Sequence, residues 1–303
     1  GVQTCALPIS SLFMGVGKMG LPMARHLHQA GHAVCVTDLD PGRLQLAREA
    51  GLTVSQDAGS DLGRASWVFS SLPHDQALLT VADQVVAQAR AGTVWIVTST
   101  VSMAASAQAA TRCQAAGIRY LRVTVSGNNH MAESAQLTVL ASGARADYDE
   151  LLPALQCWGP NHFYLGEAEQ ARLMKLVINL MIAQTSAMLA EAMTLGRQGG
   201  LDWQTLWQVV GSSAVASPIM KAKSQQLGRA LGDRDFSPTF TVHQMLKDIG
   251  LIMQAGADLH VPLTQTSQTQ QWMQAAVAQG DGELDYAAIF RVVERAAGLS
   301  GDA

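Results

Sequence analysis

Three glycines near the start of the chain have the spacing of a phosphate-binding turn. The pattern G-x-G-x-x-G is matched, between an apolar segment and a helical pattern, by Gly15, Val16, Gly17, Lys18, Met19 and Gly20. The first glycine permits a tight turn, the second lets the backbone approach a pyrophosphate, and the third allows close packing of helix on strand. Free N–H groups in the first turn of the helix would bind the phosphates. These six residues are therefore predicted to contact a dinucleotide.

A carboxylate follows at the distance that such a motif requires. Asp38 lies 18 residues beyond Gly20 (38 − 20), at the end of the next apolar segment, where it would accept hydrogen bonds from the ribose hydroxyls of NAD. Asp40 lies close by, and two carboxylates would repel the 2′-phosphate of NADP. Arg43 could attract that phosphate, but we interpret it as a solvated helix residue. The sequence therefore predicts NAD in preference to NADP.

A lysine and an asparagine occur together in a long apolar helical segment. Lys175 and Asn179 are four residues apart, so they share one face of a helix. A lysine among apolar neighbours can act as a general acid or base towards a hydroxyl or carbonyl group. The structural alternative is a lysine that extends its ammonium group from a partly buried helix into solvent. The residues alone leave both interpretations open.

Short apolar segments alternate with helical patterns through the first half of the chain. The strand-like segments are Leu12–Met14, Ala33–Thr37, Trp67–Ser71, Thr93–Thr98, Ile118–Val123, Gln136–Ser142 and His162–Leu165. The helical patterns between them are Met19–Ala30, Arg43–Ala50, Gln76–Ala87, Ala104–Ala116 and Arg145–Leu155. Such alternation predicts a parallel sheet with helical crossovers. We therefore expect a Rossmann-like α/β domain with a mostly parallel sheet over residues 1–165, which would bind NAD.

The pattern changes near Gly166, after which no segment has a convincing strand pattern. One helical pattern runs from Glu169 to Arg197, and Gly199 and Gly200 would end it. Further helical patterns are Trp203–Gly211, Pro218–Leu231, Val242–Ala257, Leu263–Gln279 and Tyr286–Ala297. The sequence predicts an all-α domain over residues 166–303, with the long helix as connector.

Composition and charge exclude several classes of partner. The formal net charge is −4 and no run of basic residues occurs, so neither nucleic acid nor an anionic membrane is expected to bind. The cysteines are scattered, which predicts free thiols in a reducing compartment and no metal site. They are Cys5, Cys35, Cys113 and Cys157.

We expect a cytoplasmic protein. The N-terminus lacks a basic region before an apolar core, so no secretory signal is predicted. The most apolar long stretch, Leu173–Met193, contains Lys175 in its interior, and a charge at that depth is costly in a bilayer. Residues 1–10 lack an initiating Met and resemble translated sequencing-adaptor read-through, so they are predicted to be foreign to the natural chain.

The run from Gly15 to Leu27, followed by Ala30, Gly31 and His32, resembles the β-hydroxyacid dehydrogenase family. This family includes 3-hydroxyisobutyrate dehydrogenases and tartronate semialdehyde reductases, and the resemblance covers nearly all of the chain after residue 10. It implies an NAD(P)-dependent oxidoreductase that transfers a hydride reversibly between NAD and a small β-hydroxy acid or its semialdehyde. It also implies that the helical domain binds substrate and forms a homodimer or homotetramer.

The resemblance assigns roles to three loops. Leu72 and Pro73, and the pair Ser99 and Thr100, would line the nicotinamide half of the cofactor. The third loop contains Ser126, Gly127 and Asn128. There the serine hydroxyl and adjacent backbone amides would hold the substrate carboxylate through charge-assisted hydrogen bonds.

The third loop departs from the family pattern D-A-P-V-S-G-G. Arg122 replaces the Asp, Thr124 replaces the Pro and Asn128 replaces the second Gly, while Asn129 and His130 add further polarity. Because the serine and the first glycine remain, we still expect this loop to bind a carboxylate. His130 is interpreted as a surface residue.

The long helix carries the family's block G-x-G-x-x-x-K-x-x-N-N. Lys175 would be the general acid or base, and Asn179 would orient it or bind the reacting hydroxyl; both would contact substrate. The glycines of the block are replaced by Glu169 and Ala171, and the first Asn by Ile178.

A later pair, Lys247 and Asp248, resembles the family's K-D block. Lys247 would reach the cofactor, and Asp248 would make a supporting contact. The alternative is a pair of adjacent charges on a solvated helix face.

Two other functions remain open. Imine reductases share this architecture but generally place Asp or Tyr at the position of Lys175, which argues against them. A non-catalytic dinucleotide-binding protein would tend to lose Ser126, Lys175, Asn179 and Lys247, and all four are present.

Overall fold

The computed structural model describes residues 10–299 and divides into two compact units, Gly1–Lys175 and Leu176–Ala303. Residues 1–9 of the segment predicted to be foreign lie outside the described residues. The first unit is α/β and the second is helical, which confirms the predicted fold class. The boundary between the units lies ten residues beyond the one expected from the sequence (175 − 165), because the first turn of the long helix is bonded to the sheet.

The first unit contains an eight-stranded, mostly parallel sheet in the order β3-β2-β1-β4-β5-β6-β7-β8. Its strands are β1 (Ser10–Met14), β2 (Ala33–Thr37), β3 (Thr53–Val54), β4 (Trp67–Ser70), β5 (Val94–Val97), β6 (Arg119–Ser126), β7 (Thr138–Ser142) and β8 (Asn161–Tyr164). The strands from β1 to β6 pair in parallel, whereas β7 is antiparallel to β6 and parallel to β8. The carboxyl ends of β1 to β6 therefore share one edge of the sheet.

Alternate strand residues supply the two faces of this sheet with separate apolar cores. Phe13, Phe69 and Ile96 belong to one core, and their neighbours Leu12, Val68 and Trp95 belong to the other. The first core is covered by α1 (Gly20–Gln29), α2 (Pro41–Glu49), α6 (Asn129–Glu133) and α7 (Arg145–Leu155). The second is covered by α3 (Ala58–Arg64), α4 (Asp75–Gln88) and α5 (Met103–Ala115). Helices on both faces fix the strand ends as a rigid base for loops.

Three short elements of the first unit were not predicted. The strand β3 has only two residues, and α6 has only five, so neither contains a full period of a hydrophobic pattern. The helix α3 includes Gly59 and Gly63, which disfavour a helix by propensity; Asp57 caps it by accepting bonds from two backbone N–H groups.

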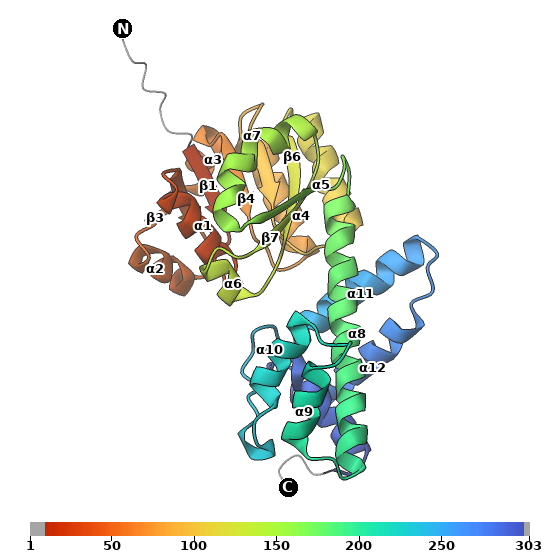
Figure 1. Cartoon of the computed structure of the whole chain (residues 1–303). Helices are drawn as coiled ribbons and strands as arrows, with labels where there is room; N and C mark the ends of the chain where they lie inside the picture. Colours follow the sequence, from red (N-terminus) through yellow and green to blue (C-terminus); the bar gives the residue numbers. More distant parts are fainter. Residues whose placement is uncertain (1–9, 300–303) are drawn as a thin grey trace. The chain divides into compact units, whose positions relative to one another are not determined.

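The helix α8 (Gln170–Gln198) continues from the first unit into the second, and Figure 1 draws it as one long green helix. It ends before Gly200, whose φ of +83° suits a glycine after a helix end. Among residues 10–299, it is the one helix long and apolar enough to cross a membrane, with 39% of its most apolar 18-residue stretch buried. A core helix of a soluble protein meets the same criteria.

The second unit is built from helices within residues 176–299, with one isolated β-bridge between Thr241 and Asp285. After α8 come α9 (Trp203–Gly211), α10 (Pro218–Leu227), α11 (Val242–Asp258), α12 (Thr264–Ala278) and α13 (Ile289–Ala296). Their core includes Met193, Trp207, Met245, Met273 and Phe290. The helix expected over Tyr286–Ala297 begins instead as a 3₁₀ turn, and α10 ends at Leu227 because Gly228 follows.

Candidate active site

Five of the predicted site segments lie at one edge of the sheet. Each begins within three residues of the carboxyl end of a parallel strand. These segments are Gly15–Gly20 after β1, Asp38 after β2, Leu72 and Pro73 after β4, Thr100 after β5, and Ser126–Asn128 at the end of β6. Open α/β sheets bind their ligands outside this edge. The structure therefore brings together residues that are up to 113 positions apart in sequence (128 − 15).

The three glycines of the first loop meet different surroundings. A side chain at Gly15 would approach the Ser71 carbonyl oxygen to 2.3 Å, and one at Gly20 would approach the Gly15 carbonyl oxygen to 2.0 Å. A side chain at Gly17 would meet no protein atom within 4 Å. Packing thus requires the outer two glycines, whereas the middle one keeps space clear for a ligand.

The helix that follows this loop starts without a side-chain cap. Met19 occupies the N-cap position of α1 and makes no capping hydrogen bond. The positive end of the helix dipole then lies at the loop, where Leu21 N donates to the Gly17 carbonyl oxygen over 3.0 Å. This combination fits a pyrophosphate.

Both oxygens of the Asp38 carboxylate accept hydrogen bonds from the backbone. Val16 N donates to Oδ2 over 2.7 Å, and Asp40 N donates to Oδ1 over 2.9 Å. Asp38 therefore holds the glycine loop against the end of β2. Since each carboxylate oxygen has two acceptor sites, the same group can also accept from ribose hydroxyls. Asp40 accepts from Gly42 N and caps α2.

The two loops predicted to face the nicotinamide are bonded to each other. Leu72 N donates to Ser99 Oγ over 2.7 Å, so the loops after β4 and β5 are connected directly. Asp75 accepts from the backbone and hydroxyl of Ser102, which joins the starts of α4 and α5 behind these loops. Ser99 is buried and Thr100 is half-buried.

The predicted substrate loop forms a turn into the short helix α6. Gly127 has a φ of +140°, which favours glycine, and its neighbour Ser126 is half-buried. Asn128 caps α6 by accepting a bond from Met131 N over 3.0 Å. Its amide group remains oriented by that cap. His26 on α1 bonds to the carbonyl oxygen of Ala132 over 2.9 Å and supports α6.

Two of the residues that depart from the family pattern, Arg122 and Glu169, contact each other. Arg122, from β6, forms a salt bridge of 2.5 Å with Glu169, the residue before α8. Glu169 also lies 3.5 Å from the guanidinium of Arg172, which is only 1% exposed. In the sequence, Arg122 and Glu169 are two separate departures. Their opposite charges are the one signal that could have predicted the pair. Arg172 was not singled out by the sequence.

The start of α8 is fixed to the sheet by further hydrogen bonds. Ser142 on β7 accepts from Ala171 N, and Thr124 on β6 donates to the Ala171 carbonyl oxygen over 2.9 Å. Lys175 follows one turn later and is half-buried. It is the last residue of the first unit.

The second unit contains the remaining predicted residues, Asn179 and Lys247. Both contact Asp248: Asn179 Nδ2 donates to its Oδ2 over 2.6 Å, and Lys247 Nζ lies 2.9 Å from its Oδ1. Asp248 is 1% exposed, so the alternative of a solvated charge pair is wrong for this carboxylate. The buried aspartate orients both side chains within the second unit.

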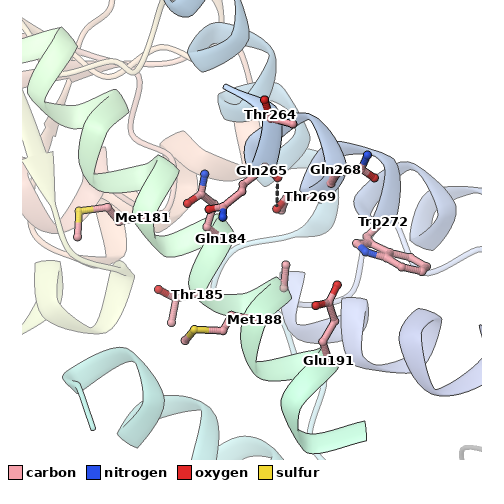
Figure 2. A pocket seen from close by; sticks show the side chains of 11 residues that line it. Met181, Gln184, Thr185, Met188, Glu191, Thr264, Gln265, Gln268, Thr269 and Trp272 are labelled. Carbon is pink, nitrogen blue, oxygen red and sulfur yellow. Dashed lines mark hydrogen bonds between the residues drawn. The ribbon is translucent and has the colours of Figure 1, made fainter. Parts of the chain in front are cut away.

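A groove of the second unit contains none of these residues. It has a volume of about 500 Å³ and lies in the second unit between α8 and α12, as Figure 2 shows, with lining residues that include Met181, Met188 and Trp272. Within residues 10–299, no group of three or more His, Cys, Asp or Glu side chains is arranged to hold a metal ion.

The sequence matches two family models in succession. Residues 11–166 match the NAD binding domain of 6-phosphogluconate dehydrogenase. Residues 170–293 match a domain described as NAD-binding of NADP-dependent 3-hydroxyisobutyrate dehydrogenase. Together they cover both compact units.

Two of the similar proteins are dehydrogenases that match this chain over nearly their whole length. The 2-(hydroxymethyl)glutarate dehydrogenase of Eubacterium barkeri is 30% identical over 291 residues, covering 95% of this chain and 96% of that protein. A solved structure of 3-hydroxyisobutyrate dehydrogenase from Mycobacterium tuberculosis, studied with L-serine, has a TM-score of 0.86 at 25% identity, covering 95% and 99% of the two chains. An imine reductase from Pseudomonas sp. has a TM-score of 0.60 at 20% identity, covering 94% and 99%, and shares the fold alone.

Proposed function

This chain belongs to the β-hydroxyacid dehydrogenase family, and from that premise we propose how its residues divide the reaction. It is an NAD(P)-dependent oxidoreductase that transfers a hydride between the cofactor and a small hydroxy acid. The observation that carries the proposed site is the convergence of five predicted segments on one sheet edge, beside an uncapped helix N-terminus. That edge suits a dinucleotide and an anionic substrate together.

The predicted substrate residues bind the carboxylate or act on the reacting oxygen in this proposal. Ser126 and the backbone of Gly127 bind the substrate carboxylate, and the amide of Asn128 adds a donor. Lys175 bonds to the reacting oxygen; it accepts the proton when the hydroxy acid is oxidised and donates it in the reverse direction. Asn179, oriented by Asp248, holds that oxygen or the lysine. The bound dinucleotide accepts or supplies the hydride.

We propose NAD rather than NADP as the preferred cofactor. Asp38 lies at the end of β2 with its carboxylate against the glycine loop, and Asp40 follows two residues later. A 2′-phosphate next to these carboxylates would experience repulsion in a partly desolvated setting. Arg43, the nearest candidate to offset it, is half-buried on α2.

Two further proposals concern the state of the protein in the cell. We propose that it is cytoplasmic, since α8 carries Lys175 and Glu191 within its apolar stretch.

We also propose a homo-oligomer formed through α8, on which Met181, Met188 and Leu195 are exposed at seven-residue intervals. That period is typical of helices that pack on one another. In light scattering, Met188→Lys should lower the molar mass; an unchanged mass would reject this interface.

Imine reduction and a non-catalytic role are the competing functions. The lysine at position 175 and the aspartate-bound Asn179 favour hydroxy-acid chemistry over both. An imine reductase would turn over a cyclic imine with NADPH and would not depend on Lys175. A non-catalytic protein would bind NADH and turn over nothing.

The decisive experiment measures NAD(P)H absorbance with a panel of hydroxy acids and the matching semialdehydes. The panel includes 2-(hydroxymethyl)glutarate, 3-hydroxyisobutyrate, glycerate and 4-hydroxybutyrate, each with NAD and NADP. We expect Lys175→Ala to lower kcat by about 10² to 10⁴ while NADH binding survives, because only the proton transfer is lost. Lys221→Ala removes an exposed lysine of α10 and serves as control. Normal kcat in Lys175→Ala would remove Lys175 from its proposed role.

A further inference from the structure

The guanidinium of Arg172 is buried and bonded to the backbone of a predicted nicotinamide loop. Its NH1 group donates to the Ser99 carbonyl oxygen over 2.5 Å, and NH2 donates to the Tyr120 hydroxyl over 3.3 Å. Arg172 is 1% exposed, so these bonds form in a setting of low polarity, where they are strong and directional. Arg172 belongs to the first turn of α8, and Lys175, the last residue of the first unit, lies in the next turn.

The same loop is bonded to its neighbour. Ser99 Oγ accepts from Leu72 N over 2.7 Å. A continuous chain of contacts thus runs from the loop after β4, through the loop after β5, to the first turn of the helix that carries Lys175. All members of this chain lie in the first unit.

The orientation of Arg172 is itself fixed from two sides. Glu169 lies 3.5 Å from its Nε and holds Arg122 through a 2.5 Å salt bridge. Tyr120, which bonds to Arg172, exchanges a 3.1 Å hydrogen bond with Ser106 and lies under the Arg122 guanidinium, 4.8 Å from ring centroid to Cζ. A planar guanidinium with this many partners has one orientation available, which a lysine could not reproduce.

Burial of the Arg172 guanidinium costs desolvation free energy, which its partners must offset. Two guanidinium groups share one carboxylate, so the cluster of Arg122, Glu169 and Arg172 carries one uncompensated positive charge. Apolar residues of similar volume often stabilise a fold as well as or better than such a cluster. What apolar residues would not supply is a directional bond to the Ser99 carbonyl oxygen.

We propose that Arg172 is a positioning residue for hydride transfer, which sets the nicotinamide loops against the first turn of α8 and thereby against Lys175. The proposal rests on the proposed function, since it needs the loops after β4 and β5 to face the nicotinamide. Arg172 touches neither substrate nor cofactor in this role. It acts through Ser99 and through the helix backbone.

The test is the steady-state kinetics of Arg172→Lys with the substrate identified in the panel. Lysine keeps the charge but cannot bond to Ser99 and Tyr120 in the same plane. We expect kcat to fall about 10- to 100-fold, because a displacement of about 1 Å can cost that much. The dissociation constant of NADH, measured by fluorescence, should stay within about threefold, since no residue that binds the phosphates changes. The isotope effect with 4-deuterated NADH should rise as hydride transfer becomes more rate-limiting.

Ser99→Ala keeps the proposal falsifiable if Arg172→Lys does not fold. Ser99→Ala removes the bond from Leu72 N at the other end of the chain of contacts, and we expect kcat to fall several-fold. If Arg172 and Ser99 act through one series of contacts, kcat of the folded double variant Arg172→Lys/Ser99→Ala should be no lower than that of the more damaged single variant. Arg119→Met, which breaks the bonds to Asp147 and Glu150 in the same unit, is the matched control and should leave kcat unchanged.

The outcomes separate this proposal from the proposed function. An inactive wild-type protein that binds NADH rejects the proposed function first. An active wild type, together with folded Arg172→Lys or Ser99→Ala retaining kcat within about twofold, rejects the positioning role and leaves the proposed function intact. A lower melting temperature with an unchanged kcat likewise assigns Arg172 to stability alone.

Discussion

Buried charge is arranged differently in the two units. In the first unit, the cluster of Arg122, Glu169 and Arg172 lies beside loops at the carboxyl ends of strands. In the second unit, Lys223 pairs with Asp285 over 2.5 Å, and both side chains are almost fully buried within the helical core. Neither of these two residues contacts a predicted site residue among the bonds described.

The difference shows that burial and pairing alone do not mark a functional charge. The pair of Lys223 and Asp285 closes a local network in which Thr239 and Ala287 also donate to the aspartate. The cluster around Arg172 instead bonds to the backbone of a loop that precedes a predicted ligand contact. What a buried charge holds in place is more informative than how deeply it is buried.

The largest expected effect is on the rate of cysteine labelling, which reports on the first unit. Burial raises the pKa of Cys113 and Cys157 to about 12, and burial together with Asp61 raises that of Cys35 to about 11. No cysteine follows Cys157 in the sequence. Because the thiolate is the reactive form, labelling of the native protein at pH 8 should be about 100- to 1,000-fold slower than in urea.

This labelling is measured with a chromogenic disulfide in a Cys5→Ser background. The rate should rise about tenfold per pH unit up to pH 9, since each unit increases the thiolate fraction tenfold. Because folding raises these pKa values, their contribution to stability is complete below pH 9 and is lost as pH rises towards 12. Native labelling as fast as in urea would show that the first unit opens readily.

Loss of the buried pair should destabilise the second unit. We expect Lys223→Met to lower the free energy of unfolding by about 3 kcal/mol, because Asp285 would be left as a buried charge without its cation. Urea titration followed by circular dichroism measures this change. Lys221→Met, two residues away on the exposed side of α10, is the control and should cost less than about 0.5 kcal/mol. The comparison fails if both variants are equally stable, or if Lys223→Met lowers kcat of the folded protein.

The sequence predicted the strand ends well because hydrophobic runs and glycine spacing are local signals. Gly15–Gly20 and Asp38 lie where the pattern placed them, and β2 has the predicted bounds. The contacts of Arg172 could not be read in the same way. Its partners Ser99 and Tyr120 are 73 and 52 positions away, and such pairing depends on strand order and on the turn that starts α8. The part that Asp248 plays was foreseen only as a supporting contact.

Asp248 is the buried charge of the second unit that does contact predicted site residues. We expect Asp248→Ala to lower kcat about tenfold or more, because Asn179 would lose the acceptor that orients it. Steady-state kinetics at saturating cofactor measure the effect. Asp281→Ala provides the control, since Asp281 pairs with Arg291 and Arg295 in the same unit. An equal loss in both variants would mean that Asp248 contributes only to folding.

The smallest expected effect concerns cofactor choice at Asp38. In Asp38→Asn, kcat/KM for NAD should fall about tenfold, because bonds from the ribose to an anion become bonds to a neutral amide. The kcat/KM for NADP should stay constant or rise, since one of two repelling charges is removed. The control is Asp40→Asn, which removes one negative charge two residues away. The Asp40 carboxylate accepts from Gly42 N, and its loss should change kcat/KM for NAD less.

The two cofactors separate the roles of Asp38. Its carboxylate also accepts from Val16 N and so holds the glycine loop, which both cofactors need. If loop support were its only task, Asp38→Asn would weaken NAD and NADP by the same factor. A fall for NAD alone therefore assigns Asp38 to the ribose hydroxyls. Cofactor selection, like the positioning role of Arg172, would then depend on the groups that the charged side chain contacts.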